Sequence, residues 1–121
     1  FQGELLTVNP DLTDYSYAPE AYDTVNLIAL GMEVAKSCDG AAIAAALQSV
    51  SKDGEYCTDF ASCKALNDAG TDFNYEGVSG PVEFADNGDP SIATMGVYEY
   101  EANDKYVPRL EEFVTGTVPT K

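Results

Sequence analysis

An apolar pattern with helical spacing over residues 19–37 is the clearest signal along this chain. Pro19 suits the first turn of a helix, because the N–H that proline lacks would have no partner there. The apolar side chains that make up the pattern are Tyr22, Val25, Leu27, Ile28, Ala29, Leu30, Met32 and Val34. An apolar surface this broad predicts a helix that packs on more than one side, as a helix does when it covers a sheet.

Two shorter helices are predicted after the long one. Asp39 is a suitable N-cap for a helix over residues 40–50. A third helix is expected to begin at Thr58 or Asp59 and to run through Leu66. Both predictions rest on a capping side chain that is followed by apolar residues at helical spacing.

Strand patterns are short. Residues 12–17 alternate loosely and predict a strand after the turn signal of residues 9–11. Residues 81–84 and 94–100 predict two strands, which the Asn-Gly turn of residues 86–90 would join into a hairpin. Helices followed by a hairpin indicate an α/β or α+β unit.

The two ends of the chain carry weaker signals. Residues 1–6 look like the end of a helix, and the first residue is Phe1 with no signal segment after it. Either a signal segment was removed or the chain is a fragment of a longer protein, and we expect the fragment. Near the other end, Asn103 and Asp104 predict a turn. The residues after that turn are expected to form a polar C-terminal extension.

Composition narrows the class of partner. The chain has 121 residues, of which 45% are hydrophobic, so one small domain with a real core is expected. Lys and Arg number 6 against 21 Asp and Glu, which gives a net charge of −15. Such a chain repels phosphate backbones, which argues against nucleic-acid binding, and it disfavours anionic membrane surfaces for the same reason.

The chain contains no His, and this excludes several kinds of chemistry. Ser-His and Cys-His nucleophile pairs and His-ligated zinc are excluded within the chain. Because no other catalytic pair is evident either, we predict that the protein is not an enzyme, that it needs no cofactor, and that it has no metal site.

Three cysteines leave two interpretations open. Cys57 and Cys63 lie six residues apart, a spacing that differs from the CxxC redox motif. A local disulfide in an exported protein is the preferred interpretation, and two buried reduced thiols are the alternative. Cys38, the odd one, is expected to be a small buried hydrophobe rather than a nucleophile.

Two loops resemble ligand-binding motifs only superficially. Residues 86–89 (Asp-Asn-Gly-Asp) are similar to the start of a calcium loop, but its twelfth position would be Val97, which cannot ligate. A hairpin turn with Asx bonds is the preferred interpretation. Residues 77–80 are glycine-rich, but they precede a strand and no Lys follows, so a phosphate cradle is not expected.

Aromatic and acidic residues gather where the predicted strand meets the long helix. Tyr15, Tyr17 and Tyr22 surround this junction and would either close over a small ligand or belong to the core. Glu20 and Asp23 lie near the helix start, where carboxylates interact favourably with the helix dipole more often than they act as acid–base catalysts.

Several segments together resemble the ABC-transporter substrate-binding proteins of the branched-chain amino-acid type. Residues 17–23 (Tyr-Ala-Pro-Glu-Ala-Tyr-Asp), the apolar helix, and residues 39–43 (Asp-Gly-Ala-Ala-Ile) carry part of the resemblance. Residues 75–84 and 86–90, continued by residues 95–100, match the family's glycine-containing hairpin more closely. The order and spacing of these segments cover residues 14–107, nearly the whole chain.

The resemblance implies a fold. Family members are type I periplasmic binding proteins, in which three crossover strands join two α/β lobes and the ligand lies in the cleft between them. Because complete members are much longer, residues 1–121 would be a C-terminal part. Residues 1–93 would form most of one partial lobe, and residues 94–121 the last hinge crossing and a C-terminal extension.

The resemblance also implies a set of residue roles. By position, Tyr17 matches the aromatic residue that lines the pocket for the ligand's side chain, and Ala18 and Glu20 are its neighbours at the site. The family often carries a short-range cysteine pair where Cys57 and Cys63 lie, which favours the disulfide. No catalytic, cofactor-binding or metal-ligating residue is implied.

The implied function is solute capture. The protein would be the extracytoplasmic or periplasmic binding component of an ABC importer, with a lipid anchor at its N-terminus left open. It would deliver a branched-chain amino acid or a related amide to a permease. The rivals are an acidic secreted module that binds a cationic protein, and an enzyme that uses paired carboxylates. A partial lobe with exposed strand edges and an exposed helix face is also expected to self-associate.

Overall fold

The computed structural model describes residues 1–100, 102 and 106–119, so the turn predicted at Asn103 and Asp104 lies outside the described residues. Helices and strands are mixed, as the α/β class predicts. Along the chain the elements are α1 (Gln2–Val8), α2 (Ala18–Ala35), α3 (Gly40–Ala46), β1 (Glu55–Cys57), α4 (Phe60–Asp68), β2 (Phe73–Gly77), β3 (Gly80–Pro81), β4 (Ile92–Tyr100) and β5 (Tyr106–Thr117).

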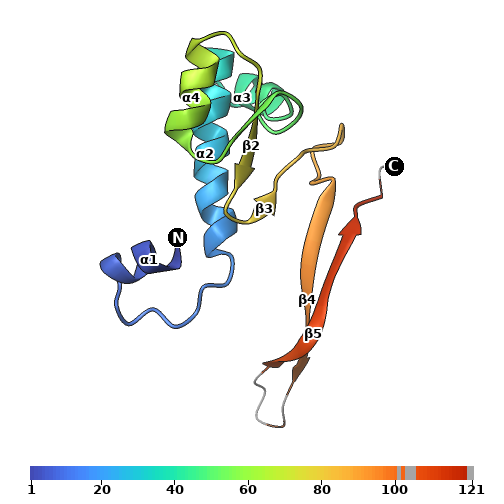
Figure 1. The fold of residues 1–121 in the computed structure, drawn as a ribbon. Coiled ribbons are helices and arrows are strands. Elements are labelled where there is room, and N and C mark those ends of the chain that lie inside the picture. The colour runs from blue at the N-terminus through green and yellow to red at the C-terminus, as the bar shows by residue number, and fades with distance from the viewer. Residues whose placement is uncertain (101, 103–105, 120–121) are drawn as a thin grey trace.

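The long helix α2 is the centre of the body, with α3 and α4 packed against it (Figure 1). It begins after Tyr17, whose backbone is left-handed at φ 61°, and it ends at Lys36, also left-handed at φ 49°. The predicted span of residues 19–37 therefore agrees with the helix to within two residues. Gly31 allows the close approach of α3, since a Cβ there would lie 3.1 Å from Ile43 Cγ2.

Two parallel strands that the sequence analysis missed lie beside this helix. β1 pairs with β2 in parallel and β2 pairs with β3 antiparallel, which gives the order β1-β2-β3. Phe73 and Tyr75 of β2 are buried and pack with Leu27, Leu30 and Val50 in the core. β2 thus faces α2, which confirms that the helix packs against a sheet.

Both shorter helices begin where their capping residues predict. The Asp39 carboxylate accepts hydrogen bonds from the N–H groups of Ala41 and Ala42 at 3.1 and 3.0 Å. The Asp59 carboxylate accepts one from Ser62 N–H at 2.9 Å. The helix predicted over residues 40–50 ends earlier, at Ala46, and turns carry the chain onward from there.

The disulfide between Cys57 and Cys63 is present and joins β1 to α4, with the two Cα atoms 5.2 Å apart. Both cysteines are buried in the core cluster. Cys38 is exposed, so the expectation that it is a buried hydrophobe was wrong. It lies in the short connection after α2, where no neighbouring element covers it.

The strand predicted over residues 12–17 is absent, and its loose alternation was misleading. Polar groups there bond locally instead: Asp14 Oδ1 accepts from Ser16 N–H at 2.9 Å, and the Tyr15 hydroxyl donates to Leu12 O at 3.2 Å. The left-handed backbone of Tyr17 then turns the chain into α2. Within the described residues, no strand pairs with this segment.

The predicted pairing of residues 81–84 with residues 94–100 was also wrong. β4 forms the expected second strand, but its partner is β5, antiparallel with Gly96 opposite Phe113. The segment expected to be a polar extension is therefore a strand. In place of the predicted ladder, Phe84 and Pro90 form an isolated bridge, and Pro81 of β3 pairs with Glu76 of β2.

The turn of residues 86–89 closes on itself. Ala85 N–H donates to Asp89 O at 2.8 Å, and Gly88 N–H donates to Ala85 O at 2.9 Å. The side chains of Asn87 and Asp89 complete it, with Asn87 Nδ2 donating to Asp89 Oδ2 at 2.8 Å and Asp89 N–H donating to Asn87 Oδ1 at 3.1 Å. These bonds confirm the Asx-stabilised turn.

One part of the predicted apolar surface of α2 does not enter the core. Leu27, Leu30 and Gly31 are buried, but Val25 is 68% exposed. α3, α4 and β2 all pack around the buried stripe, which leaves an opposite stripe open. The exposed members of that stripe are Tyr22, Val25, Ile28 and Met32.

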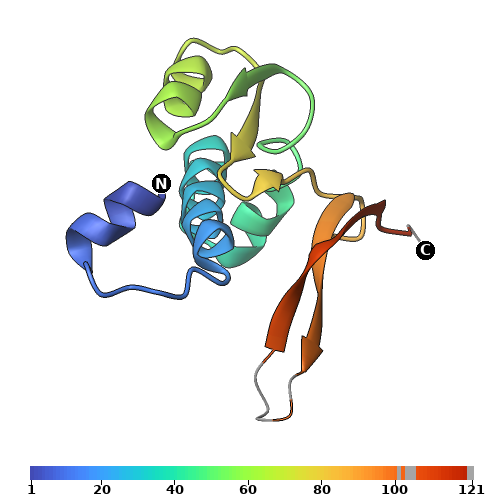
Figure 2. The same ribbon diagram turned by 60° about the horizontal axis from the view of Figure 1, so that its bottom comes forward.

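The remaining elements lie outside the body. α1 confirms helical structure near the N-terminus, and the Phe1 ring contacts the Tyr22 ring edge-on with centroids 5.4 Å apart. β4 and β5 form a long two-stranded ribbon that projects away from the helices (Figures 1 and 2). Within the described residues, no helix combines the length and apolar character that a membrane span needs.

Candidate ligand-binding site

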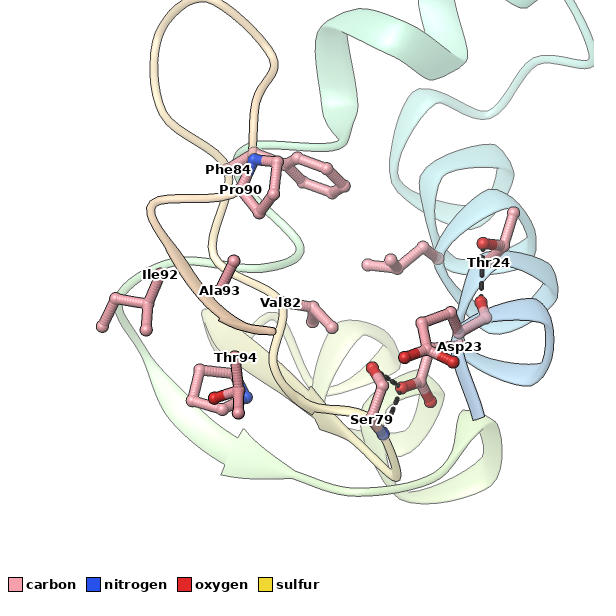
Figure 3. Close-up of a pocket in the computed structure, with 12 residues that line it drawn as sticks. Asp23, Thr24, Ser79, Val82, Phe84, Pro90, Ile92, Ala93 and Thr94 are labelled. Carbon is pink, nitrogen blue, oxygen red and sulfur yellow. Dashed lines mark hydrogen bonds between the residues drawn. The ribbon is translucent and has the colours of Figure 1, made fainter. Parts of the chain in front are cut away.

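Two hollows adjoin at the N-terminal end of α2, between this helix and the start of β4. The first has a volume of about 350 Å³ and lies below the loop that follows β3 (Figure 3). The second has a volume of about 600 Å³ and runs along β4. Glu20 and Thr94 line both, so the two hollows adjoin at these residues, and we refer to the two together as the groove.

The wall of the first hollow is fixed by a buried carboxylate. Asp23, only 2% exposed, points from α2 toward the turn between β2 and β3. Its Oδ1 accepts the Tyr75 hydroxyl at 2.8 Å and Val78 N–H at 3.0 Å. Its Oδ2 accepts Ser79 N–H at 2.7 Å and also a short bond from the Ser79 hydroxyl, as Figure 3 shows. Four donors thus surround one buried charge.

The Tyr75 hydroxyl completes this network. Asn26 Nδ2 donates to it at 3.2 Å while it donates to Asp23. Burial and the adjacent carboxylate raise the pKa of Tyr75 well above its ordinary value, because both disfavour a phenolate there. Tyr75 therefore stays a neutral donor at every physiological pH. The lone pairs of the two Asp23 carboxylate oxygens are occupied by these hydrogen bonds. The Asp23 carboxylate therefore has a structural role, in holding the turn, and is no acid–base catalyst.

Gly77 explains how the carboxylate reaches this turn. A Cβ atom at position 77 would collide with the carboxylate of Asp23. The glycine-rich residues 77–80 therefore do receive an anion, but it is a carboxylate of the same chain. Because Asp23 occupies the N–H groups of Val78 and Ser79, they are not available to a phosphate, in line with the sequence analysis.

The three site residues predicted from the sequence lie close together but differ in exposure to the groove. Tyr17 is 81% exposed and lines the second hollow. Glu20, one turn into α2, lines both hollows. Ala18 lines neither, and its N–H donates to Tyr15 O at 3.1 Å at the start of the helix. That these residues bind a ligand stays a prediction.

The aromatic residues that β4 and β5 bring to the groove were not predicted from the sequence as site residues. Tyr98, Tyr100 and Phe113 line the second hollow together with Tyr17. Gly96 makes room for one of them, since a Cβ there would lie 2.9 Å from the ring and hydroxyl of Tyr98. The signal was the alternation of Gly96, Tyr98 and Tyr100 on one face of a predicted strand.

The charge of the groove is negative. Among the described residues that line either hollow, none is Lys or Arg, while Glu20 and Asp23 are acidic. Within the described part of the chain, no group of three or more His, Cys, Asp or Glu side chains is placed to hold a metal ion. The arrangement is suited to binding a small molecule by aromatic and apolar contacts around one available carboxylate.

A comparison with protein families gives one match. The model of the family described as "Receptor family ligand binding region" matches residues 4–103. These residues include most of α1, all of α2–α4 and β1–β4, and every residue that lines the two hollows except Phe113. No curated protein and no solved structure matches this chain.

Proposed function

The chain belongs to the receptor ligand-binding-region family, and on that premise we propose that it captures a small solute outside the cytoplasm. Proteins of this family bind ligands, have the type I periplasmic-binding-protein architecture, and are not enzymes. The α/β arrangement of this chain is consistent with part of one lobe of that fold. Capture requires burial of the solute as the lobes close, and no nucleophile or general base.

The observation that carries the proposal is the groove shared by the two hollows. Tyr17 and Glu20, which the resemblance to solute-binding proteins assigns to the ligand site, line the second hollow together. The hydrogen bonds from Val78 and Ser79 to the Asp23 carboxylate hold the turn that lines the first hollow in place. A preformed groove with aromatic walls and few polar groups is the usual form of a small-molecule site.

In its finer form, the proposal concerns an ABC importer. The chain would form part of the importer's binding component and deliver a branched-chain amino acid or a related amide to the permease. Residues 94–121 would include the segment that crosses to a second lobe. The projection of β4 and β5 from the body supports that assignment, because crossing strands must leave the lobe that they start in.

Calorimetric titration of the gene's full product with a panel of amino acids and amides tests the proposal. We expect one solute to bind at a single site, and the Tyr17→Ala variant to lose at least about tenfold in affinity, the effect of removing an aromatic contact. Tyr56→Ala is the matched control, since Tyr56 is also exposed but lies on β1 outside both hollows. Absence of binding across the panel would overturn the proposal.

The net charge of −15 favours a second candidate function, an acidic module that binds a cationic protein. Such binding would rest on long-range attraction and would weaken steeply as salt rises. Titration with a cationic protein such as lysozyme at low and high salt distinguishes the two functions. Capture of a solute without net charge in the groove should change little with salt, because it rests mainly on contacts inside a hollow.

We also propose that this chain, on its own, associates with a second copy of itself. Val25 and its neighbours form an exposed apolar stripe on α2, and β1 is an open edge of its sheet. Charge repulsion between two copies opposes contact, so association should strengthen with salt. Sedimentation velocity would show dimers at high salt, and a single monomer species at every salt concentration would contradict the proposal.

A further inference from the structure

The lining of the second hollow differs from that of an ordinary apolar pocket. Five of its eleven lining residues are aromatic, and they come from two separate parts of the chain: the segment before α2 and the β4–β5 ribbon. Aromatic residues from both parts of the chain therefore line the same hollow. These residues are Tyr15, Tyr17, Tyr98, Tyr100 and Phe113.

One carboxylate accompanies these rings. Glu20 is the single acidic residue that lines the second hollow, and no Lys or Arg lines it within the described chain. Its backbone carbonyl accepts the Thr24 hydroxyl at 2.7 Å, but no described group pairs with its carboxylate. The nearby first hollow adds a second acidic residue, Asp23, whose carboxylate accepts hydrogen bonds from Tyr75, Val78 and Ser79. The groove therefore has a negative potential with no cation of its own.

Aromatic faces and a carboxylate attract the same kind of ligand. The negative face of a tyrosine ring attracts a cation whose charge is spread over an apolar surface. A carboxylate beside the rings adds Coulomb attraction that is stronger in a partly enclosed site than in water. We propose that the second hollow binds an organic cation that has no carboxylate, with a quaternary ammonium group on a small apolar body. This inference rests on the solute capture proposed above and names its ligand class.

Other ligand classes fit the lining less well. A ligand whose only charge is a carboxylate or phosphate would meet Glu20 with no Lys or Arg to offset the repulsion. A calcium or magnesium ion needs several oxygen ligands, and the second hollow offers one carboxylate. A neutral apolar solute would contact the rings but would leave the Glu20 charge unused.

Gly96 and Tyr98 show that the aromatic wall is built into the strand. The Tyr98 ring lies over Gly96, where any larger residue would displace it. Both residues belong to β4, and the pairing of β4 with β5 is irregular between them. Gly96→Val should therefore move the ring and weaken cation binding without touching Glu20.

The test compares choline with its uncharged isostere, in which a tert-butyl group replaces the trimethylammonium group. Calorimetric titration of the gene's full product should give choline about tenfold tighter binding than the isostere. Glu20→Gln should remove most of that preference. Tyr17→Leu should weaken choline binding, whereas Tyr17→Phe, which keeps the ring face, should retain it. Tyr56→Ala again serves as the control, and circular dichroism confirms that each variant is folded.

The outcomes separate this inference from the proposed function. Equal affinity for choline and the isostere, or an unchanged preference in Glu20→Gln, would overturn the cation assignment. Binding of a neutral amino acid or amide that depends on Tyr17, with no binding of choline, would leave solute capture standing and also overturn it. If neither choline nor any solute of the panel binds, both proposals fall.

Discussion

The Tyr75 hydroxyl on β2 donates a hydrogen bond to Oδ1 of Asp23 on α2 at 2.8 Å, across 52 positions of sequence. This contact joins the central helix to the central strand inside the core. It also orients the carboxylate toward Val78 and Ser79, so that a single buried charge positions the turn beside the groove. The stability of the fold and the shape of the candidate site therefore depend on the same pair.

Substitution of Asp23 should cost more stability than substitution of its tyrosine partner. Asp23→Asn places an amide group against N–H donors and leaves at least one of them unpaired, at a cost of about 3 kcal/mol. Tyr75→Phe removes one of four donors and should cost about 1.5 kcal/mol. Urea unfolding of both single variants and the double variant measures the coupling. Strictly additive effects would show that the two residues do not act together.

Gly77 should tolerate no side chain. Gly77→Ala forces a methyl group into the Asp23 carboxylate, so we expect a loss of about 3 kcal/mol in the free energy of unfolding. Gly40→Ala is the matched control, because a Cβ there meets open space at the start of α3. Thermal unfolding followed by circular dichroism compares them. A Gly77→Ala variant as stable as the control would contradict the described geometry.

The disulfide should stabilise the fold by about 2 kcal/mol, the value that loop closure over six residues gives. Replacement of Cys57 and Cys63 together by Ala should lower the unfolding midpoint, and a reducing agent should lower it in the parent chain only. Cys38→Ala serves as the control because that cysteine is exposed and free. Equal sensitivity of the parent and the Cys57/Cys63 variant to reduction would contradict the assignment.

Acid should weaken the cap of α4. Hydrogen bonds from the Ser62 N–H and hydroxyl lower the pKa of Asp59 below 3.8. Because the folded pKa is the lower one, the cap's contribution is present above pH 4 and is lost as pH falls through the folded pKa. Asp59→Asn keeps a capping side chain that does not titrate. Its stability relative to the parent should therefore rise as the pH falls below about 4, as urea unfolding between pH 3 and 7 would show.

An intermediate variant checks the cause of that acid dependence. Ser62→Ala removes the hydroxyl donor but keeps the backbone N–H, so its pH profile should lie between those of the parent and Asp59→Asn. Identical profiles for all three chains would show that Asp59 does not titrate in the way that its hydrogen bonds require.

The parts of the fold that depend on neighbouring residues were predictable from the sequence. Asp39 and Asp59 bond to amides two or three positions away, so their helices begin where the residue types predict. α2 was predicted for the same reason, from a long apolar period. The cysteine pair, separated by only six residues, also falls in this class.

Contacts between distant segments were not predictable in this way. β4 pairs with β5 rather than with the nearer residues 81–84, and the local alternation of either segment does not reveal which partner it takes. Phe73 and Tyr75 alternate with polar residues in β2, but β2 has only five residues. So short an alternation is a weaker signal than the longer helical patterns that precede it. The apolar pattern of α2 also did not indicate which of its apolar side chains would be buried by neighbouring elements and which would stay exposed.

The candidate site shows the same division. Tyr17 and Glu20 lie three residues apart at the start of one helix, and the sequence placed them together. Tyr98 and Phe113 reach the same hollow from another part of the chain, through the β4–β5 register. The binding of Asp23 to Ser79 spans 56 positions, which explains why the sequence analysis expected only a helix-dipole role for Asp23.

The most direct test of solute capture is to locate the bound solute by amide chemical-shift perturbation on the isotopically labelled protein. The best binder from the solute panel, at saturation, should shift the amides of Tyr17, Glu20 and Thr94, which line the groove. Amides of α4, such as Ala65, should not move. Shifts confined to α4 or β1 would contradict the account, because the solute would then bind outside the groove that its aromatic and acidic residues form.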